Sequence, residues 1–127
     1  MAEPMFKSES MVFCTDVNPG PPMDLLGVYD ALQCDRFPTQ LRGFVVSSIV
    51  SLVDVHVTIA VTIESTNRRG TAQTVKAPSH LHPGPNVEVL PLYELMAAEP
   101  GPYLATLLVN GQILARRKLE VTARART

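Results

Sequence analysis

The sequence has few aromatic and few charged residues. It contains no tryptophan, and only 6% of its 127 residues are aromatic and 18% are charged. A surface that stacks bases or sugar rings depends on aromatic side chains, so this composition disfavours such a surface. The formal net charge of −1 provides no overall field to attract nucleic acid or an anionic membrane. We therefore expect neither partner, while the largely neutral surface mildly favours self-association.

Cysteine is scarce, and long apolar runs are missing from the sequence. The two cysteines, Cys14 and Cys34, match no metal-ligand spacing and no redox pair. Residues 1–11 carry several charged side chains, and the apolar core of a secretory signal does not follow them. The remaining apolar stretches are interrupted well before the length that crosses a membrane. These features predict a cytoplasmic protein with reduced thiols and no membrane partner.

Two patterns in the chain predict β-structure. Asn110-Gly111 stands between two apolar runs, and this dipeptide is the strongest short-range signal for a two-residue β-hairpin. Between Val55 and Glu64 the β-branched aliphatic residues share one parity, and mostly polar residues share the other. This alternation predicts a strand with one dry and one wet face.

The distribution of turn residues indicates the fold class. Eleven prolines and seven glycines fall between short apolar runs, as turns between strands do. We predict an all-β protein, an antiparallel β-sandwich of seven to eight strands that is immunoglobulin-like or jelly-roll-like. At most one short helical turn is expected, near 92–98. The chain 1–127 is predicted to form a single domain, with 1–9 and 124–127 flexible.

Several local features refine this prediction. Gly27 lies inside an expected strand and suggests either a bulge or a close backbone approach. Residues 78–85 are rich in proline and histidine and are predicted to form a loop. A β-bulge is expected between Ala115 and Lys118, because the apolar residues change parity there. Gly101-Pro102-Tyr103 resembles the start of the penultimate strand in immunoglobulin-like domains, where a tyrosine ties a corner to the backbone.

The order of several motifs is similar to that of a known family. The motifs are Phe13-Cys14, Leu26-Gly27-Val28-Tyr29-Asp30, Phe37-Pro38, Phe44-Val45-Val46, Pro100-Gly101-Pro102-Tyr103 and Leu107-Leu108-Val109-Asn110-Gly111. In this order the chain resembles a family of small bacterial β-sandwich proteins of similar length, a domain of unknown function. The resemblance implies a bacterial, cytosolic β-sandwich. It implies no catalytic residues.

His80-Leu81-His82 is the clearest candidate metal site in the sequence. Residues two apart project to the same side of an extended backbone, so both imidazoles can reach one ion. We expect His56 or Glu88 as the third ligand. The alternative is a solvated loop without a metal, because prolines surround the motif and no ligand follows at zinc-finger spacing. No other cofactor is expected.

The sequence contains no recognised catalytic motif. Glycine-rich phosphate loops, a Gly-x-Ser-x-Gly elbow and Cys-x-x-Cys pairs are missing from it. We therefore expect a non-enzymatic protein–protein interaction or structural module that self-associates as a homo-oligomer. Leu104 and Leu108 are the candidate interface, because they are exposed if the Tyr103 face of their strand is buried. Burial of both faces within one subunit is the alternative.

Two further functions remain open at this stage. The first is a β-sandwich that binds a small ligand or a metal through the loop 78–86. The second is a hydrolase, which would need His56 or His82 beside an aspartate and a serine or threonine in a pocket. A nearby hydroxyl alone does not establish a nucleophile, since geometry must support it first.

Overall fold

The computed structural model describes residues 5–124, and its regular elements are strands. They are β1 (Phe6–Asn18), β2 (Asp24–Tyr29), β3 (Ala31–Cys34), β4 (Thr39–Gln40), β5 (Phe44–Ser51), β6 (Val55–Ser65), β7 (Gln73–Leu81), β8 (Gly84–Pro91), β9 (Met96–Ala97), β10 (Gly101–Val109) and β11 (Gln112–Ala123). The described residues include no helix long and apolar enough to cross a membrane.

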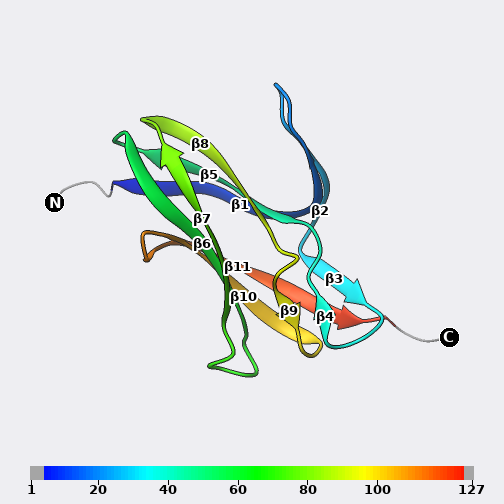
Figure 1. Cartoon of the computed structure of the whole chain (residues 1–127). Coiled ribbons are helices and arrows are strands. Elements are labelled where there is room, and N and C mark those ends of the chain that lie inside the picture. The colour runs from blue at the N-terminus through cyan, green and yellow to red at the C-terminus, as the bar shows by residue number, and fades with distance from the viewer. Residues whose placement is uncertain (1–4, 125–127) are drawn as a thin grey trace.

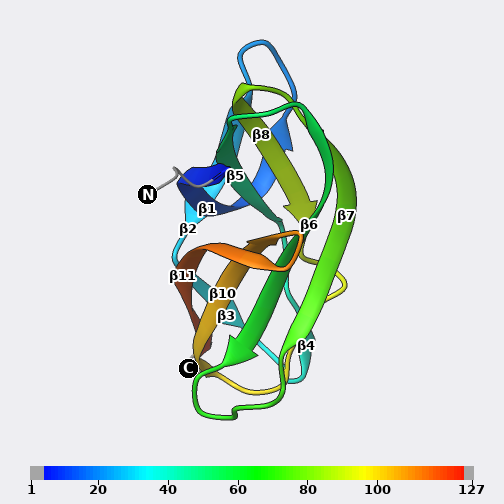
Figure 2. The same cartoon turned by 90° about the vertical axis from the view of Figure 1, so that its left-hand side faces the viewer.

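The strands form two main sheets that face each other (Figures 1 and 2). One sheet has four strands in the order β2-β1-β5-β8, and the other has five in the order β3-β11-β10-β6-β7. Neighbouring strands are antiparallel except for β3 and β11, which are parallel. The prediction of an all-β, immunoglobulin-like sandwich is confirmed. The strand count exceeds the expected range because β3 and the short β4–β9 pair are additional.

The core lies between the two sheets and contains side chains from both. From β6 it takes Val57, Ile59, Val61 and Ile63, as the alternating sequence predicted. From β10 it takes the face that begins at Tyr103, and from the four-stranded sheet it takes residues such as Phe13, Val45, Ile49 and Leu90. Full burial of one such aliphatic or aromatic side chain stabilises the fold by about 1.5–3 kcal/mol. Burial of these side chains is the main contribution that holds the two sheets together.

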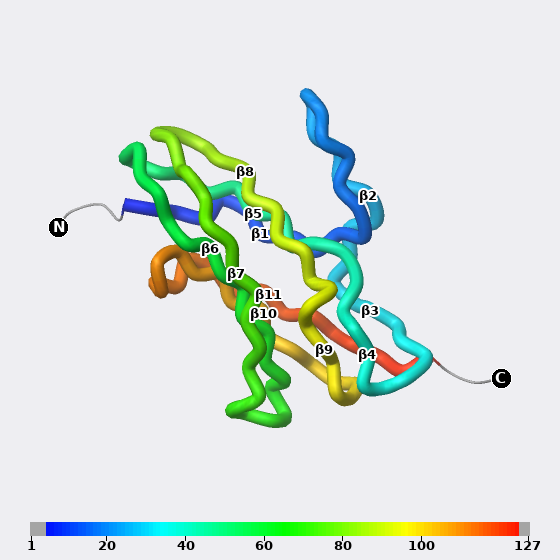
Figure 3. Tube along the Cα trace, viewed as in Figure 1, coloured from blue at the N-terminus to red at the C-terminus, as the bar shows by residue number. Residues whose placement is uncertain are grey.

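The hairpin of β1 and β2 extends beyond the sandwich on the outer side of the four-stranded sheet (Figures 1 and 3). Gly27 has a φ of 64°, and a Cβ at this position would lie 2.2 Å from the Oγ1 of Thr15. The Thr15 hydroxyl donates to the Leu26 carbonyl at 2.9 Å. The register between β1 and β2 is continuous around Gly27, so the strand has no bulge there. Of the two predictions for Gly27, the close backbone approach is confirmed.

The terminal hairpin turns at Asn110 and Gly111, whose φ angles of 50° and 81° fit a type I′ turn. Leu107 pairs with Ala115 while Leu108 pairs with Ile113, so Leu114 is the extra residue of a β-bulge. The expected bulge is therefore present, but its predicted place between Ala115 and Lys118 is wrong. The extra residue, Leu114, lies one position before the predicted range and close to the tight turn. It returns the later apolar residues of β11 to the buried face.

The bulge also turns Arg117 toward the space between the sheets. Its Nη1 donates to the Met11 carbonyl at 3.0 Å, and its Nη2 pairs with the Asp30 carboxylate at 2.5 Å. Arg117 lies in register with Ala105, which is buried in the core, so its stem follows the inner face of β11. The guanidinium reaches β1 and the β2–β3 junction, where it ties the two sheets together.

The structure corrects one sequence prediction about the chain ends and gives the conformation of the segment near 92–98. Residues 6–9 are not a flexible end, because they belong to β1 and Phe6 is buried. Residues 1–4 and 125–127 of the predicted flexible ends lie outside the described residues. The segment near 92–98 forms a turn with a hydrogen bond from the Leu95 amide to the Leu92 carbonyl, and then β9.

The predicted loop at 78–85 is largely strand. β7 continues through Leu81 and β8 begins at Gly84, so only His82 and Pro83 connect them. Prolines interrupt a central strand because they lack an amide donor, but an edge strand has one side free of ladder bonds. β7 and β8 each form one edge of their sheets. The prolines therefore mark sheet edges here, and the inference of a loop was wrong.

Candidate functional site

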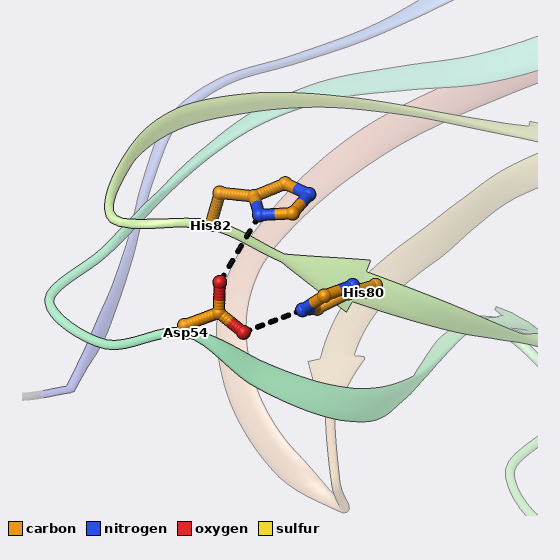
Figure 4. Close-up of side chains that lie close together, drawn as sticks. All are labelled: Asp54, His80 and His82. Carbon is orange, nitrogen blue, oxygen red and sulfur yellow. Dashed lines mark hydrogen bonds and ion pairs between the residues drawn. The ribbon is translucent and has the colours of Figure 1, made fainter.

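The carboxylate of Asp54 lies between the rings of His80 and His82 at one end of the five-stranded sheet (Figure 4). Asp54 directly precedes β6, His80 belongs to β7, and His82 directly follows β7. The Nε2 of His80 is 2.6 Å from the Oδ1 of Asp54. The Nδ1 of His82 is 3.2 Å from Oδ2 of the same carboxylate. Each imidazole thus contacts a different carboxylate oxygen.

The antiparallel register explains why these residues meet. Val55 pairs with Leu81, so the residues just beyond them, Asp54 and His82, are opposite each other at the end of the ladder. His80 pairs with His56 one step further along and projects from the same face as His82. The site therefore follows from extending the β6–β7 pairing by one residue.

Two polar side chains hold the backbone on either side of the cluster. The buried Ser51 hydroxyl accepts from the Val53 amide at 3.2 Å and donates to the Val53 carbonyl at 2.6 Å, which shapes the turn before Asp54. The Asn86 side chain accepts from the His82 amide at 3.0 Å and donates to the His82 carbonyl at 2.9 Å. Asn86 thereby fixes the backbone of His82.

The electrostatics of the cluster favour an ionised aspartate. Hydrogen bonds from His80 and then from His82 lower the pKa of the Asp54 carboxyl group below its ordinary value. The side chains remain accessible, with exposed fractions of 59% for Asp54, 38% for His80 and 64% for His82. Two imidazoles and a carboxylate whose ligand atoms lie within 4.8 Å of one another can hold a metal ion.

Neither residue expected as a third ligand joins this set. His56 stacks on His80 with ring centroids 4.1 Å apart, outside the group of ligand atoms that gather around the carboxylate. Glu88 accepts a hydrogen bond from the Ser79 hydroxyl at 2.5 Å. Sequence reasoning missed Asp54, although its position just before the alternating strand is a usable signal once the β6–β7 register is assumed.

A second feature is the outer face of the four-stranded sheet, which we call the apolar face. Cross-strand pairs align Val28, Cys14, Phe44 and Pro91 in one row, Val12, Val46 and Val89 in the next, and Ser10, Ser48 and Val87 in a third. None of these side chains is charged. Val28 and Val87 are exposed to 56% and 53%. Cys14 and Val46 in these rows are buried, so the exposed part of this uncharged face lies mainly at Val28, Val87 and Val89.

The β1–β2 hairpin makes one part of this face concave. Met23 and Leu25 of the hairpin, together with Val46 and Val87 of the sheet, line a groove of about 230 Å³. Met23 and Leu26 are 40% and 48% exposed. The hairpin therefore adds apolar side chains beside the apolar face.

Leu104 and Leu108, the interface candidates from the sequence, lie on the outer face of the other sheet. The condition for their exposure holds, because Tyr103, Leu107 and Val109 on the opposite face of β10 are buried. Both leucines are nevertheless only partly exposed. Leu104 stands between Glu64 and Lys118 in the neighbouring strands, so charged side chains flank it.

A separate cleft of about 380 Å³ lies near the carboxyl-terminal end of β11. Its lining includes Arg36, Arg42 and Arg124, along with Asp35 and Cys34, and no histidine. Arg124 forms an ion pair with Asp35 at 3.3 Å. The histidines that a hydrolase was expected to use are therefore not part of this cleft, and His82 with Asp54 lies on an open strand surface.

Tyr103 forms the corner that the sequence motif suggested. Its hydroxyl donates to the Glu99 carbonyl at 2.6 Å, four residues upstream at the turn before β10. This is the tyrosine corner of immunoglobulin-like domains, in which the penultimate long strand is tied to the preceding turn. Together with the sandwich architecture it places the chain in the immunoglobulin-like fold class.

Comparisons with known proteins agree with this class. No family model and no curated protein matches the chain. Among solved structures, an immunoglobulin-like protein from Pseudomonas aeruginosa matches with a TM-score of 0.50 and 9% identity, covering 95% of this chain and 99% of the other. This neighbour shares nearly the full length of the chain. At such low identity the likeness shows the fold alone.

Two other solved structures are similar over part of their length. The alkylpurine DNA glycosylase AlkC of Pseudomonas fluorescens matches with a TM-score of 0.61 and 16% identity, covering 94% of this chain and 31% of that chain. A β-glucosidase from Listeria innocua matches with a TM-score of 0.54 and 13% identity, covering 95% of this chain and 16% of that chain. The chain thus corresponds to a minor part of each of these enzymes.

Proposed function

We propose that this protein is a non-enzymatic interaction module that self-associates through the apolar face of its four-stranded sheet. The observation that carries the proposal is the uncharged, aliphatic surface built by Val12, Val28, Val87 and Val89. An antiparallel sheet with one face in water normally alternates apolar and polar residues. Exposed apolar patches of this kind mark interaction surfaces.

The sequence of β5 supports burial of the outer face. Phe44, Val45 and Val46 are consecutive, and Ile49 and Val50 follow after two serines. A continuous apolar run is typical of a strand covered on both faces. The core covers one face, and on the other Val46 is buried while Phe44 and Val50 remain partly exposed in a single chain. A partner that binds the apolar face would cover the second face of β5, as the apolar sequence of this strand favours.

A second copy of the chain is the partner that the observations favour. Four strands about 4.8 Å apart and seven residues rising about 3.4 Å each give a projected area of roughly 450 Å². The hairpin groove adds to this area, and a specific interface needs about 500 Å² per partner. The central rows carry no charge and the chain has a formal net charge of only −1, so two copies repel each other weakly.

The proposal includes the setting that the sequence resemblance implies. We propose a bacterial, cytoplasmic protein of the small β-sandwich family that the chain resembles. Support for a reducing compartment comes from Cys14 and Cys34, which are both free thiols and both buried. The partial matches to a glycosylase and a β-glucosidase are compatible with an accessory role, because the fold forms only a part of those enzymes.

The test compares one substitution on each outer face. Val87→Glu places a charge in the apolar face, and Ile113→Glu places one beside Leu108, at similar exposures of 53% and 49%. Light scattering coupled to size exclusion should give the wild type twice the 13.8 kDa chain mass. Val87→Glu should give the monomer, because an unpaired buried charge costs about 3–5 kcal/mol. Ile113→Glu should remain dimeric.

A monomeric wild type at high micromolar concentration would overturn the proposal. Loss of the dimer in Ile113→Glu but not in Val87→Glu would instead place the interface at Leu104 and Leu108. Circular dichroism of both variants verifies that the fold is intact. Both substitutions are at exposed positions, so the folded monomer is expected to tolerate them.

A further inference from the structure

We propose that Asp54, His80 and His82 form a binding site for one divalent transition-metal ion, with zinc as the best match. This site lies at the end of the β6–β7 ladder (Figure 4) and is independent of the self-association proposed above. It differs from the site expected from the sequence, because the carboxylate comes from the residue before β6 and the histidines come from a strand end.

The distances fit a chelate that needs little rearrangement. Zinc binds imidazole nitrogen and carboxylate oxygen at about 2.0–2.2 Å, so neighbouring tetrahedral ligands are roughly 3.3 Å apart. The two Asp54 oxygens are already 2.6 Å and 3.2 Å from the histidine nitrogens. No two of the ligand atoms are more than 4.8 Å apart. Small rotations of exposed side chains therefore bring all three within bonding distance of one ion.

The nitrogen and oxygen ligands also select the class of metal. Two neutral imidazoles and one carboxylate suit zinc, nickel, cobalt and copper, whereas magnesium and calcium prefer oxygen ligands alone. A bound dication replaces the hydrogen bonds of the cluster, because the same nitrogen and oxygen atoms bind the metal.

The surrounding structure holds the three ligands in place. Ser51 shapes the turn before Asp54, and Asn86 binds the His82 backbone through its amide and carbonyl. His56 stacks on the ring of His80 and limits its rotation. Preorganised ligands lose less conformational freedom when the metal binds. Because all three side chains are accessible, water can fill the fourth position of a tetrahedral ion.

The experiment titrates zinc chloride into the untagged full-length chain and follows the heat released. We expect one ion per chain. Asp54→Asn, His80→Gln and His82→Gln should each weaken binding by at least about tenfold, since each removes a direct ligand. The matched control is Glu88→Gln, which removes a carboxylate that bonds Ser79 outside the ligand set, and it should bind zinc within about threefold of the wild type. His56→Gln removes the ring that stacks on His80, so it should weaken binding less than the loss of a direct ligand does.

Further measurements distinguish a defined site from loose surface binding. Magnesium and calcium should produce no heat, and cobalt should give the visible spectrum of a site with low coordination number. Zinc affinity should fall in acid, because protons compete with the metal for the ligand atoms. Absence of zinc binding by the wild type overturns the proposal. Zinc binding by Asp54→Asn at the wild-type affinity overturns the assignment of Asp54 as the third ligand.

The outcome is separable from the proposed dimer. Zinc titration of Val87→Glu should give the same affinity as the wild type, because Val87 lies on the apolar face of the other sheet. The dimer measurement is repeated with a chelator present. Failure of the dimer with intact zinc binding, or the reverse, then contradicts one proposal and leaves the other standing.

Discussion

The outer faces of the two sheets differ in chemistry although their inner faces are alike. On the five-stranded sheet, Arg116, Thr106, Thr62 and Thr74 form a polar row across β11, β10, β6 and β7. On the four-stranded sheet the corresponding central row is Val12, Val46 and Val89. Both sheets bury aliphatic and aromatic side chains against the shared core.

This difference separates two roles of apolar residues in a β-sandwich. The inner faces account for folding, since they form the core between the sheets. The polar outer face matches contact with water, and its one exposed cluster of ligand-type side chains lies at Asp54, His80 and His82 within residues 5–124. Neither folding nor contact with water explains the apolar outer face in a single chain. Matched substitutions in the two sheets therefore test whether the two outer faces have different roles.

The largest expected contrast is between the hairpins of the two sheets. Gly27→Ala in the β1–β2 hairpin should lower the free energy of unfolding by about 2–4 kcal/mol, because the methyl group meets Thr15 at a positive φ. Gly111→Ala in the β10–β11 hairpin should cost about 1–2 kcal/mol, since its Cβ points into open space. Urea unfolding of both variants measures the difference. Equal losses would contradict the close approach at Gly27.

A smaller contrast is expected between the two tyrosines that anchor turns. Tyr103→Phe removes the buried hydrogen bond to the Glu99 carbonyl and should lower the free energy of unfolding by about 1–1.5 kcal/mol. Tyr29→Phe removes the hydrogen bond from β2 of the other sheet to the carbonyl of Arg42, which precedes β5, and should cost about 0.5–1 kcal/mol, because that site is more open. Thermal unfolding checks the order, and a larger loss in Tyr29→Phe would reverse it.

Alkaline titration provides a second measurement on Tyr29. Burial, followed by the charges of Cys14 and Cys34, raises the pKa of Tyr29 to about 12. The unfolded chain loses this proton near the ordinary value of 10.0. The associated stability is therefore full below pH 10.0 and is lost as the pH rises toward about 12. The ultraviolet titration step removed by Tyr29→Phe should be centred near the higher value.

The smallest expected effect concerns acid and belongs to the polar outer face. Because hydrogen bonds from His80 and His82 lower the pKa of Asp54 from 3.8, its stabilising effect is present above that pH and is lost as the pH falls further. Asp54→Asn should flatten the decline of the urea midpoint below that pH. Asp24→Asn removes an exposed carboxyl group of the other sheet and serves as the control. Identical acid profiles for Asp54→Asn and the wild type would contradict the cluster.

Much of the fold could be predicted because its signals are local. The alternation of Val57, Ile59 and Val61 appears unchanged as the buried face of β6, and Asn110-Gly111 forms the expected turn. The prolines at 78–85 misled the prediction, since proline excludes a central strand but tolerates an edge. The order of the strands in a sheet decides which of them lie at its edges. No short segment of the sequence determines that order.

The candidate sites show the same division. His80 and His82 were found because residues two apart share a side of any strand. Asp54 was missed because its contact with them depends on how β6 pairs with β7. Leu104 and Leu108 were chosen from the parity of one strand, whereas the apolar face combines residues of β1, β2, β5 and β8. Such a face cannot be found before the strand order is known.

The sequence alone determined the alternating strand at 55–64, its dry face and the terminal turn, because backbone geometry and side-chain alternation act over a few residues. The tertiary structure decided which aspartate meets the two histidines, which strands combine into the apolar outer face, and that Arg117 turns inward after the bulge at Leu114. These outcomes depend on register and sheet order. Both are set by the shared core, which joins residues far apart in the chain.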